Sequence, residues 1–164
     1  MLLAVLSDTH LSGPDQHFLT LYERHLASAD AVLHCGDMVS SQLYHFLAAH
    51  PRFYCVRGNC DHFQLDHDLP AALSLGLELP GGKTLRIGMA HGWGERSSVG
   101  LRVAELFPDH DLVCYGHTHR RDWSELPSKG KRLNPGSALE GSLALVEVAA
   151  DGSMTCRFVD LDVD

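Results

Sequence analysis

Leu2-Leu3-Ala4-Val5-Leu6-Ser7-Asp8-Thr9-His10 is an apolar run that ends abruptly in a polar cluster. A run this short and this apolar is typical of a strand that is covered on both faces of its sheet. The same change from apolar to polar residues occurs four more times, and the later clusters are His34-Cys35-Gly36-Asp37, Arg57-Gly58-Asn59-Cys60-Asp61, His91-Gly92 and Gly116-His117-Thr118-His119. Ligands of α/β sheets bind outside the carboxyl ends of the strands, so we expect these clusters to meet at one edge.

Helical patterns separate the apolar runs in the first half of the chain. Pro14 fits an early position of a helix whose apolar stripe lies within residues 18–26. Ser40 or Ser41 fits the cap of a second helix that ends before Pro51. The alternation of strand and helix favours an α/β sheet.

The second half contains mainly short extended segments, and glycine pairs mark its turns. Gly81-Gly82 and Asp151-Gly152 each separate two such segments and predict hairpins. We therefore expect an α/β sandwich of mixed sheets, in a four-layer α/β/β/α arrangement, with the site at the carboxyl ends of the strands. Its 164 residues suit one domain, residues 1–164.

The composition excludes several classes of protein. No apolar stretch approaches the roughly 20 residues that a membrane span needs, and the run before Asp8 lacks a basic leader, so we expect a cytoplasmic protein. Five cysteines without a C-x-x-C pair are expected to be reduced. The formal net charge of −8 argues against a long nucleic-acid track, whereas a small phosphorylated substrate stays compatible because bound metal adds positive charge.

The polar clusters carry residue types that bind transition metals. Asp8 and His10 are two residues apart, as are His117 and His119, and in an extended chain such pairs point to the same side. Glycines beside the clusters permit sharp turns and close approach of the backbone. Imidazole, carboxylate and amide groups without an evident thiolate favour Mn, Fe, Zn, Co or Ni over a structural zinc site.

Five motifs occur in a fixed order, namely Asp8-x-His10, Gly36-Asp37, Gly58-Asn59, His91-Gly92 and Gly116-His117-x-His119. In this order they resemble the calcineurin-like metallophosphoesterase superfamily. Two further segments, Gly58-Asn59-Cys60-Asp61 and Asn134-Pro135-Gly136-Ser137, resemble its small single-domain bacterial and archaeal phosphodiesterase branch.

The resemblance implies two divalent metal ions, with Mn as the first choice and Fe, Zn, Ni and Co as alternatives. The ligands implied for the first metal are Asp8, His10, Asp37 and His119. The ligands implied for the second metal are Asp37, Asn59, His91 and His117, so that Asp37 bridges the pair. The implied reaction is hydrolysis of a small phosphate ester by a hydroxide that bridges the metals, and we expect the ester to be a diester. Asp37, Asn59 and His91 are the implied catalytic residues.

One residue departs from the family pattern. Many relatives have a histidine after the Gly-Asn pair, where it is expected to assist the leaving group or bind the phosphoryl oxygen, and this chain has Cys60. Asn59 and Cys60 are therefore the candidate substrate contacts. A thiol is a poor proton donor in place of imidazole, so we expect activated esters and diesters to be better substrates than simple alkyl monoesters.

Other interpretations remain open at this point. One branch of the family is a non-enzymatic scaffold, a retromer subunit that has lost key ligands, and a nuclease is a weaker third alternative. A symmetric homo-oligomer is the default expectation. Several residues keep two interpretations each, one structural and one next to the site; they are His34, Arg57, Asp61, His62, His67, Trp93, the pair Arg120-Arg121 and the segment Asn134–Ser137. For Trp93 we expect packing, and for Asn134–Ser137 a turn that supports the site.

Overall fold

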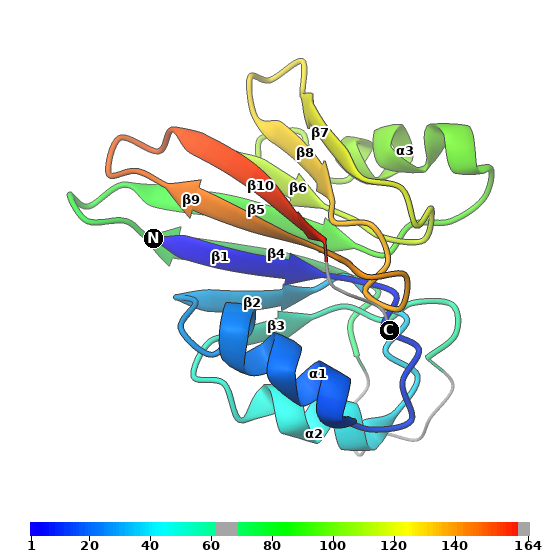
Figure 1. Ribbon diagram of the computed structural model, residues 1–164. Coiled ribbons are helices and arrows are strands. Elements are labelled where there is room, and N and C mark those ends of the chain that lie inside the picture. Colours follow the sequence, from blue (N-terminus) through cyan, green and yellow to red (C-terminus); the bar gives the residue numbers. More distant parts are fainter. Residues whose placement is uncertain (62–68, 161–164) are drawn as a thin grey trace.

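Two five-stranded sheets face each other in the computed structural model, which describes residues 1–61 and 69–160 (Figure 1). The first sheet has the order β10-β9-β1-β2-β3. Its strands are β1 (Leu2–Leu6), β2 (Ala31–His34), β3 (Phe53–Cys55), β9 (Ser142–Val148) and β10 (Met154–Asp160). The second sheet has the order β4-β5-β6-β8-β7. Its strands are β4 (Ala72–Glu78), β5 (Thr84–Ala90), β6 (Leu112–Cys114), β7 (Asp122–Glu125) and β8 (Lys131–Asn134).

Both sheets are mixed, as the sequence predicts. In the first sheet β1, β2 and β3 are parallel, whereas β9 and β10 are antiparallel to their neighbours. In the second sheet β5, β6 and β8 are parallel, and β4 and β7 are antiparallel at its edges. The parallel strands of each sheet therefore present their carboxyl ends at a common edge.

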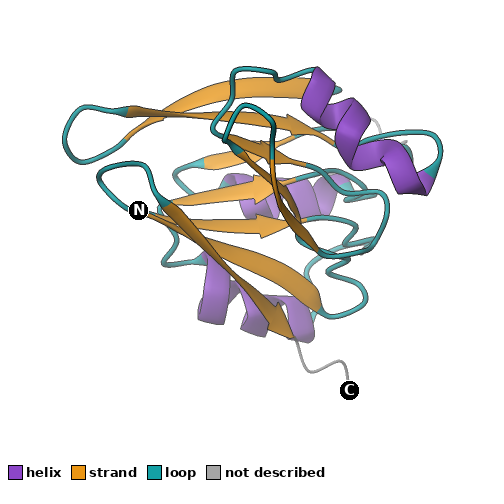
Figure 2. Cartoon of the chain, turned by 90° about the horizontal axis from the view of Figure 1, so that it is seen from above, coloured by secondary structure: helices purple, strands orange, loops and turns teal. Residues whose placement is uncertain are grey.

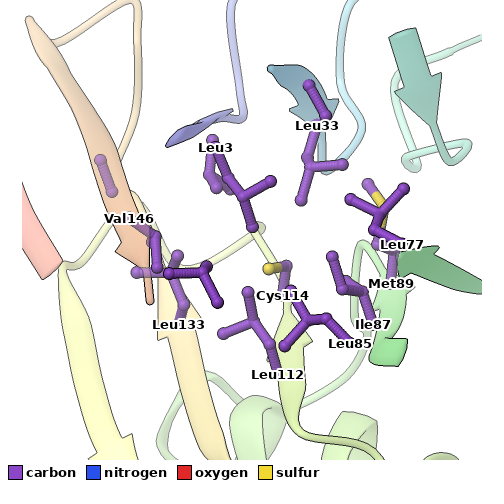
Figure 3. Packing of buried hydrophobic residues seen from close by; sticks show 14 of the residues in the cluster. Leu3, Leu33, Leu77, Leu85, Ile87, Met89, Leu112, Cys114, Leu133 and Val146 are labelled. Atoms are coloured by element: carbon purple, nitrogen blue, oxygen red, sulfur yellow. The ribbon is translucent and has the colours of Figure 1, made fainter. Parts of the chain in front are cut away.

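The space between the sheets is the main hydrophobic core (Figure 3). Side chains alternate along β1, so that Leu3 and Val5 point into this core whereas Ala4 and Leu6 pack on the opposite face. Leu112 and Cys114 of β6 enter the same core from the second sheet. Because both faces of β1 are covered, its apolar run has no polar interruption before Ser7.

Helices cover the outer face of each sheet. They are α1 (Gln16–Leu21), the π-helical turn η1 (Tyr22–Leu26) and α2 (Ser41–Ala48) on the first sheet, and the 3₁₀ turn η2 (Arg96–Ser98) and α3 (Val99–Glu105) on the second. Figure 1 shows α1 and α2 beside β2 and β3, and Figure 2 gives the same layers from above. The order helix, sheet, sheet, helix confirms the four-layer α/β/β/α sandwich.

The helix boundaries follow local capping. Ser40, one of the two predicted capping residues, caps α2. Its hydroxyl accepts a hydrogen bond from the Leu43 amide at 3.1 Å. The first helix begins at Gln16 rather than at Pro14, because the Asp15 carboxylate caps it by accepting from the Phe18 amide at 2.8 Å. Both predicted hairpins are present, between β4 and β5 and between β9 and β10. Within the described residues, no helix has the length and apolar character that a bilayer span requires.

Candidate metal centre

The five polar clusters meet at the carboxyl ends of β1, β2, β3, β5 and β6. Backbone hydrogen bonds join their loops, from the Asp8 amide to the Gly36 carbonyl at 2.9 Å and from the Gly116 amide to the His91 carbonyl at 3.1 Å. We call the predicted ligand residues the metal-candidate cluster; they are Asp8, His10, Asp37, Asn59, His91, His117 and His119. The sequence-based expectation that these segments converge on one edge is confirmed.

Short distances connect the side chains of the metal-candidate cluster. Nε2 of His91 lies 3.3 Å from Oδ2 of Asp37 and 3.9 Å from Oδ1 of Asp8. Nε2 of His119 lies 3.3 Å from Oδ1 of Asp8. Nδ1 of His117 lies 2.9 Å from Oδ1 of Asn59.

Among residues 1–61 and 69–160, three groups of side chains bring their ligand atoms within 4.8 Å of one another. They are Asp8 with His10 and His119, Asp8 with Asp37 and His91, and His10 with Asp37 and Cys60. The first group lies inside the ligand set expected for the first metal. The second group joins the two expected sets, with Asp8 from the first, His91 from the second and Asp37 from both. The third group adds Cys60, which we expect as a substrate contact and not as a ligand.

Two buried polar atoms in this cluster have no hydrogen-bond partner, namely Oδ1 of Asp8 and Nε2 of His91. Asp8 is fully buried and His91 is 3% exposed, so bulk water does not reach these atoms. Nδ1 of His91 bonds the carbonyl oxygen of Cys35 at 2.7 Å and must donate to it, which leaves the lone pair on Nε2. That lone pair faces the carboxylates of Asp8 and Asp37, which repel it. A cation between the three groups would replace this repulsion by attraction. The residues therefore fit a bound metal ion.

Burial and mutual contact shift the pKa values of these groups in opposite directions. Burial raises the pKa of Asp8, and the nearby His91 and His119 only partly offset it. Burial also raises the pKa of Asp37, but the nearby His91 ring and the hydrogen bond from the Cys60 amide outweigh it and hold the pKa below its usual range. Burial lowers the pKa of His91, yet its contacts with Asp37 and Asp8 give a net increase. The two carboxylates thus occupy distinct electrostatic environments within one site.

Backbone geometry at the cluster corrects one expectation. Asp8, His10, Asp37, His117 and His119 have positive φ angles of 54°, 48°, 58°, 66° and 58°. They are left-handed residues, so the extended chain that we assumed for the pairs two apart is wrong. Each of these residues lies two to five positions after the end of β1, β2 or β6, in the loop that follows the strand. Such conformations cost about 1 kcal/mol or more per residue and concentrate at functional sites.

Two glycines permit the close packing of the loops. Gly58 lies against Asp37, and a Cβ atom there would overlap the Asp37 amide and carboxylate. Gly36 has a φ of 96°, and a Cβ atom would stand 2.8 Å from both the Gly58 amide nitrogen and Nδ1 of His91. The expectation that these glycines allow close backbone approach is confirmed.

Asp61 ties two loops of the site together. Its Oδ2 accepts hydrogen bonds from the amides of Asp37 at 3.0 Å and Gly58 at 2.7 Å, and its Oδ1 accepts from Val39 at 2.8 Å. The Asp61 carboxylate therefore closes the turn, which is its structural interpretation. It also fixes the backbone of Asp37, a predicted ligand, which is its interpretation next to the site.

The Asn134–Ser137 segment supports the cluster as predicted. The Ser137 hydroxyl donates to the Asp8 carbonyl at 3.0 Å, and Asn134 Nδ2 donates to the Gly116 carbonyl at 2.8 Å. Glu140, which follows this segment, contacts Nδ1 of His119 through its Oε1 at 2.8 Å. Sequence reasoning missed Glu140, because no motif or apolar run marks it.

His34 lies beneath the loops as a satisfied core histidine. Its Nδ1 accepts from the Gly36 amide at 3.1 Å, so Nε2 carries the proton towards the Thr9 hydroxyl, also at 3.1 Å. Burial lowers its pKa to about 4. It makes no contact with Asp37 itself and acts on the site through the backbone of Gly36.

The structure also shows the positions of further residues for which two interpretations were open. Trp93 is 49% exposed, so the expectation that it packs is wrong; its loop follows β5 and turns outward before α3. Arg121 pairs with Asp160, whereas Arg120 is exposed. His62 and His67 lie outside the described residues.

Cys60 lies at the border of the cluster. Its amide donates to Oδ1 of Asp37 at 2.7 Å, and its Sγ accepts from Asn59 Nδ2 at 3.2 Å. Burial and the neighbouring Asp37 carboxylate raise the pKa of the thiol. In the metal-free protein Cys60 is therefore a neutral thiol directed at the same space as His10 and Asp37.

Known proteins resemble this chain in both sequence and fold. A family model, the calcineurin-like phosphoesterase superfamily domain, matches residues 1–151. The probable metallophosphoesterase YsnB of Bacillus subtilis is 31% identical over 140 residues, which cover 84% of this chain and 75% of that protein.

Solved structures extend the likeness over nearly the whole chain. Wild-type Vps29 of Entamoeba histolytica, complexed with Zn²⁺, is 26% identical with a TM-score of 0.67, covering 99% of this chain and 100% of that chain. A predicted phosphoesterase of Streptococcus pneumoniae TIGR4 is 23% identical with a TM-score of 0.70, covering 98% of this chain and 90% of that chain. The latter likeness shows the shared fold.

Proposed function

The chain belongs to the calcineurin-like phosphoesterase superfamily, and from that premise we propose that it is a divalent-metal-dependent phosphodiesterase for small phosphate esters. One observation carries the proposal above all others. The buried Oδ1 of Asp8 and Nε2 of His91 lack partners and face a common space with Asp37. A cation in that space would compensate both atoms, as buried polar and charged groups require.

We propose that the metal-candidate cluster holds two divalent ions. Asp8, His10 and His119 would belong to the first ion, Asn59, His91 and His117 to the second, and Asp37 to both. Nitrogen and oxygen donors at a partly open site suit Mn²⁺, with Fe, Zn, Ni and Co as alternatives. Two bound ions supply positive charge that polarises a phosphoryl oxygen and makes water a stronger nucleophile.

The protein residues prepare this site by fixing ligand orientation. The Cys35 carbonyl sets the tautomer of His91, so that its Nε2 lone pair points into the cluster. Asp61 holds the backbone of Asp37, and Glu140 does the same for the His119 ring. Asn59 adds no negative charge, which preserves the positive charge that attracts a phosphate ester.

Cys60 limits the chemistry that the proposed enzyme performs well. A thiol has an ordinary pKa of about 8.5 and is a weaker acid than imidazolium for protonating an alkoxide leaving group. Good leaving groups need no such proton. We therefore propose that diesters with aryl or similarly activated leaving groups are cleaved faster than alkyl monoesters.

A second candidate function is a non-catalytic scaffold for protein binding, as expected for retromer subunits of this fold. The likeness to Vps29 favours it. Because that Vps29 structure contains Zn²⁺, metal binding by itself does not distinguish the two functions. Hydrolysis of a substrate by the metal-loaded protein distinguishes them.

The test compares hydrolysis of bis(p-nitrophenyl) phosphate and p-nitrophenyl phosphate after reconstitution with Mn²⁺. Asp37→Ala and His91→Ala should lower the diesterase rate by at least about 100-fold, because each removes a ligand. Asp109→Ala removes an exposed carboxylate outside the cluster and serves as the matched control, with an unchanged rate. Wild-type protein that binds metal in calorimetry but turns over no faster than Asp37→Ala would leave the scaffold as the better account.

A further inference from the structure

A hollow of about 600 Å³ lies next to the metal-candidate cluster. Thr118 forms part of its wall and stands between His117 and His119 in the chain, so the hollow and the cluster share one loop. The same loop, between β6 and β7, also contributes Tyr115, Arg120 and Arg121. The rest of the wall comes from Glu95 and η2, from the first turn of α3 and from the strands β7 and β8. Its volume is within the range of small-molecule sites.

Positive charge is concentrated in this hollow, although the chain as a whole carries −8. Four arginines line it, namely Arg96, Arg120, Arg121 and Arg132. We call the hollow the arginine pocket. Its acidic lining residues are Glu95 and Asp122.

Two of the arginines are already engaged by the protein. Nε of Arg132 donates to Oδ2 of Asp122 at 2.6 Å, and the same oxygen accepts from the Tyr115 hydroxyl at 2.8 Å. Arg121 pairs with Asp160 and donates through Nε to the Ser142 hydroxyl at 2.7 Å. These two side chains build the wall and have limited capacity for a ligand.

Arg96 and Arg120 differ from them. Among residues 1–61 and 69–160, neither side chain takes part in an ion pair or a hydrogen bond, and both are exposed. Glu95, the remaining acidic neighbour, accepts from the Ser97 hydroxyl at 3.0 Å. Two guanidinium groups are thus available in a pocket that adjoins the proposed reaction centre.

Arg96 and Arg120 line the same pocket as Thr118, which stands between His117 and His119 in the chain. Arg120 follows His119 directly. Because the pocket and the metal-candidate cluster adjoin at this loop, a ligand of small-molecule size can span both.

We propose that the arginine pocket binds a second phosphate group of the substrate, so that the ester cleaved at the metal centre belongs to a molecule with at least two phosphates. This inference rests on the proposed phosphodiesterase function. The planar guanidinium group binds phosphate through paired, charge-assisted hydrogen bonds, and Arg96 and Arg120 offer two such groups. A simple diester with neutral substituents would leave both without a partner.

A matched pair of substrates tests the proposal. Thymidine 5′-(p-nitrophenyl phosphate) has one phosphate, and its 3′-phosphorylated derivative has two. With the wild-type protein we expect KM to be about tenfold lower for the derivative, since one charge-assisted contact of this kind changes affinity by about that factor. Arg96→Gln and Arg120→Gln should each remove most of this advantage while leaving kcat for the simple diester unchanged.

Arg24→Gln is the matched control, because Arg24 is an exposed arginine of η1 on the opposite helical layer. It removes the same charge and should keep the tenfold advantage. Equal KM values for the two substrates would overturn the proposal. An equal loss in Arg24→Gln and Arg96→Gln would also overturn it, because the effect would then come from the net charge of the protein.

A binding measurement separates failure of the pocket from failure of the proposed function. Calorimetry with thymidine 3′,5′-bisphosphate on metal-free protein in chelator requires no turnover. Affinity that falls about tenfold in Arg96→Gln but not in Arg24→Gln supports the pocket even if neither ester is hydrolysed. Affinity that is the same in all three proteins overturns the pocket even if the diesterase activity is real.

Discussion

Replacing Asp61 with alanine should weaken both the fold and the metal centre. The Asp61 carboxylate accepts three backbone hydrogen bonds, at 2.7, 2.8 and 3.0 Å, from Gly58, Val39 and Asp37. Each is a half-buried bond to a charged acceptor, and water refills part of the space that alanine leaves. At about 1 kcal/mol per bond, Asp61→Ala should lower the free energy of unfolding by about 3 kcal/mol.

Asp61→Asn separates loss of bonds from loss of charge. An amide whose oxygen takes the place of Oδ2 keeps the acceptor for Asp37 and Gly58, but it sets an NH₂ group against the Val39 amide. We therefore expect an intermediate destabilisation of about 1–2 kcal/mol. Urea unfolding of metal-free protein in chelator measures these values without a contribution from bound metal.

The effect on the metal centre follows from the same bonds. Because Asp61 fixes the backbone of Asp37, its loss should lower Mn²⁺ affinity in calorimetry by about 10- to 100-fold, as for other residues that orient ligands. Asp151→Ala is the matched control, since Asp151 accepts from the Ser153 amide in an exposed hairpin. Full stability and unchanged Mn²⁺ affinity in Asp61→Ala would refute the role that we assign to Asp61.

Two further predictions concern the same edge of the sheets. Gly58→Ala places a Cβ atom on the Asp37 backbone and should cost about 1–3 kcal/mol in urea unfolding together with most Mn²⁺ binding, whereas Gly13→Ala, which meets the flexible Gln42 side chain, should change neither by much. The buried His34 has its pKa lowered to about 4, so the unfolded chain takes up its proton first as pH falls through 6.5. Stability from His34 is complete above pH 6.5 and is lost towards pH 4, by about 3 kcal/mol relative to His34→Gln in chelator; parallel pH profiles of the two proteins would contradict this.

The apolar runs predict the fold because a strand that is buried on both faces needs apolar residues at consecutive positions, and such a run is visible in the sequence. The run before Ser7 reads as a strand between two apolar layers, and the structure places β1 there. The polar clusters predict the site for a related reason, since each follows a parallel strand and parallel strands end at one edge. Both inferences use only short-range patterns and the general geometry of sheets.

Other features of the site depend on backbone angles or on contacts between residues that are distant in the sequence, and no local pattern predicts them. The spacing of Asp8 and His10 suggests an extended chain, whereas both residues are left-handed because the strand ends at a tight turn. Glu140 reaches His119 across 21 positions of sequence, and nothing local distinguishes it from any exposed glutamate. The arginine pocket likewise joins Arg96 of η2 to Arg120 of the loop between β6 and β7.

Left-handed residues and unpartnered buried atoms both destabilise the same edge of the sandwich. The five left-handed residues alone cost about 5 kcal/mol or more at roughly 1 kcal/mol each, which is comparable to the whole stability of a domain of this size. The edge persists because every strand that leads to it is anchored between two apolar layers, so that its loops cannot relax without opening the core. A rigid sandwich thus keeps Asp8, Asp37 and His91 facing one another before any cation arrives, which is the preorganisation that an electrostatic catalyst requires.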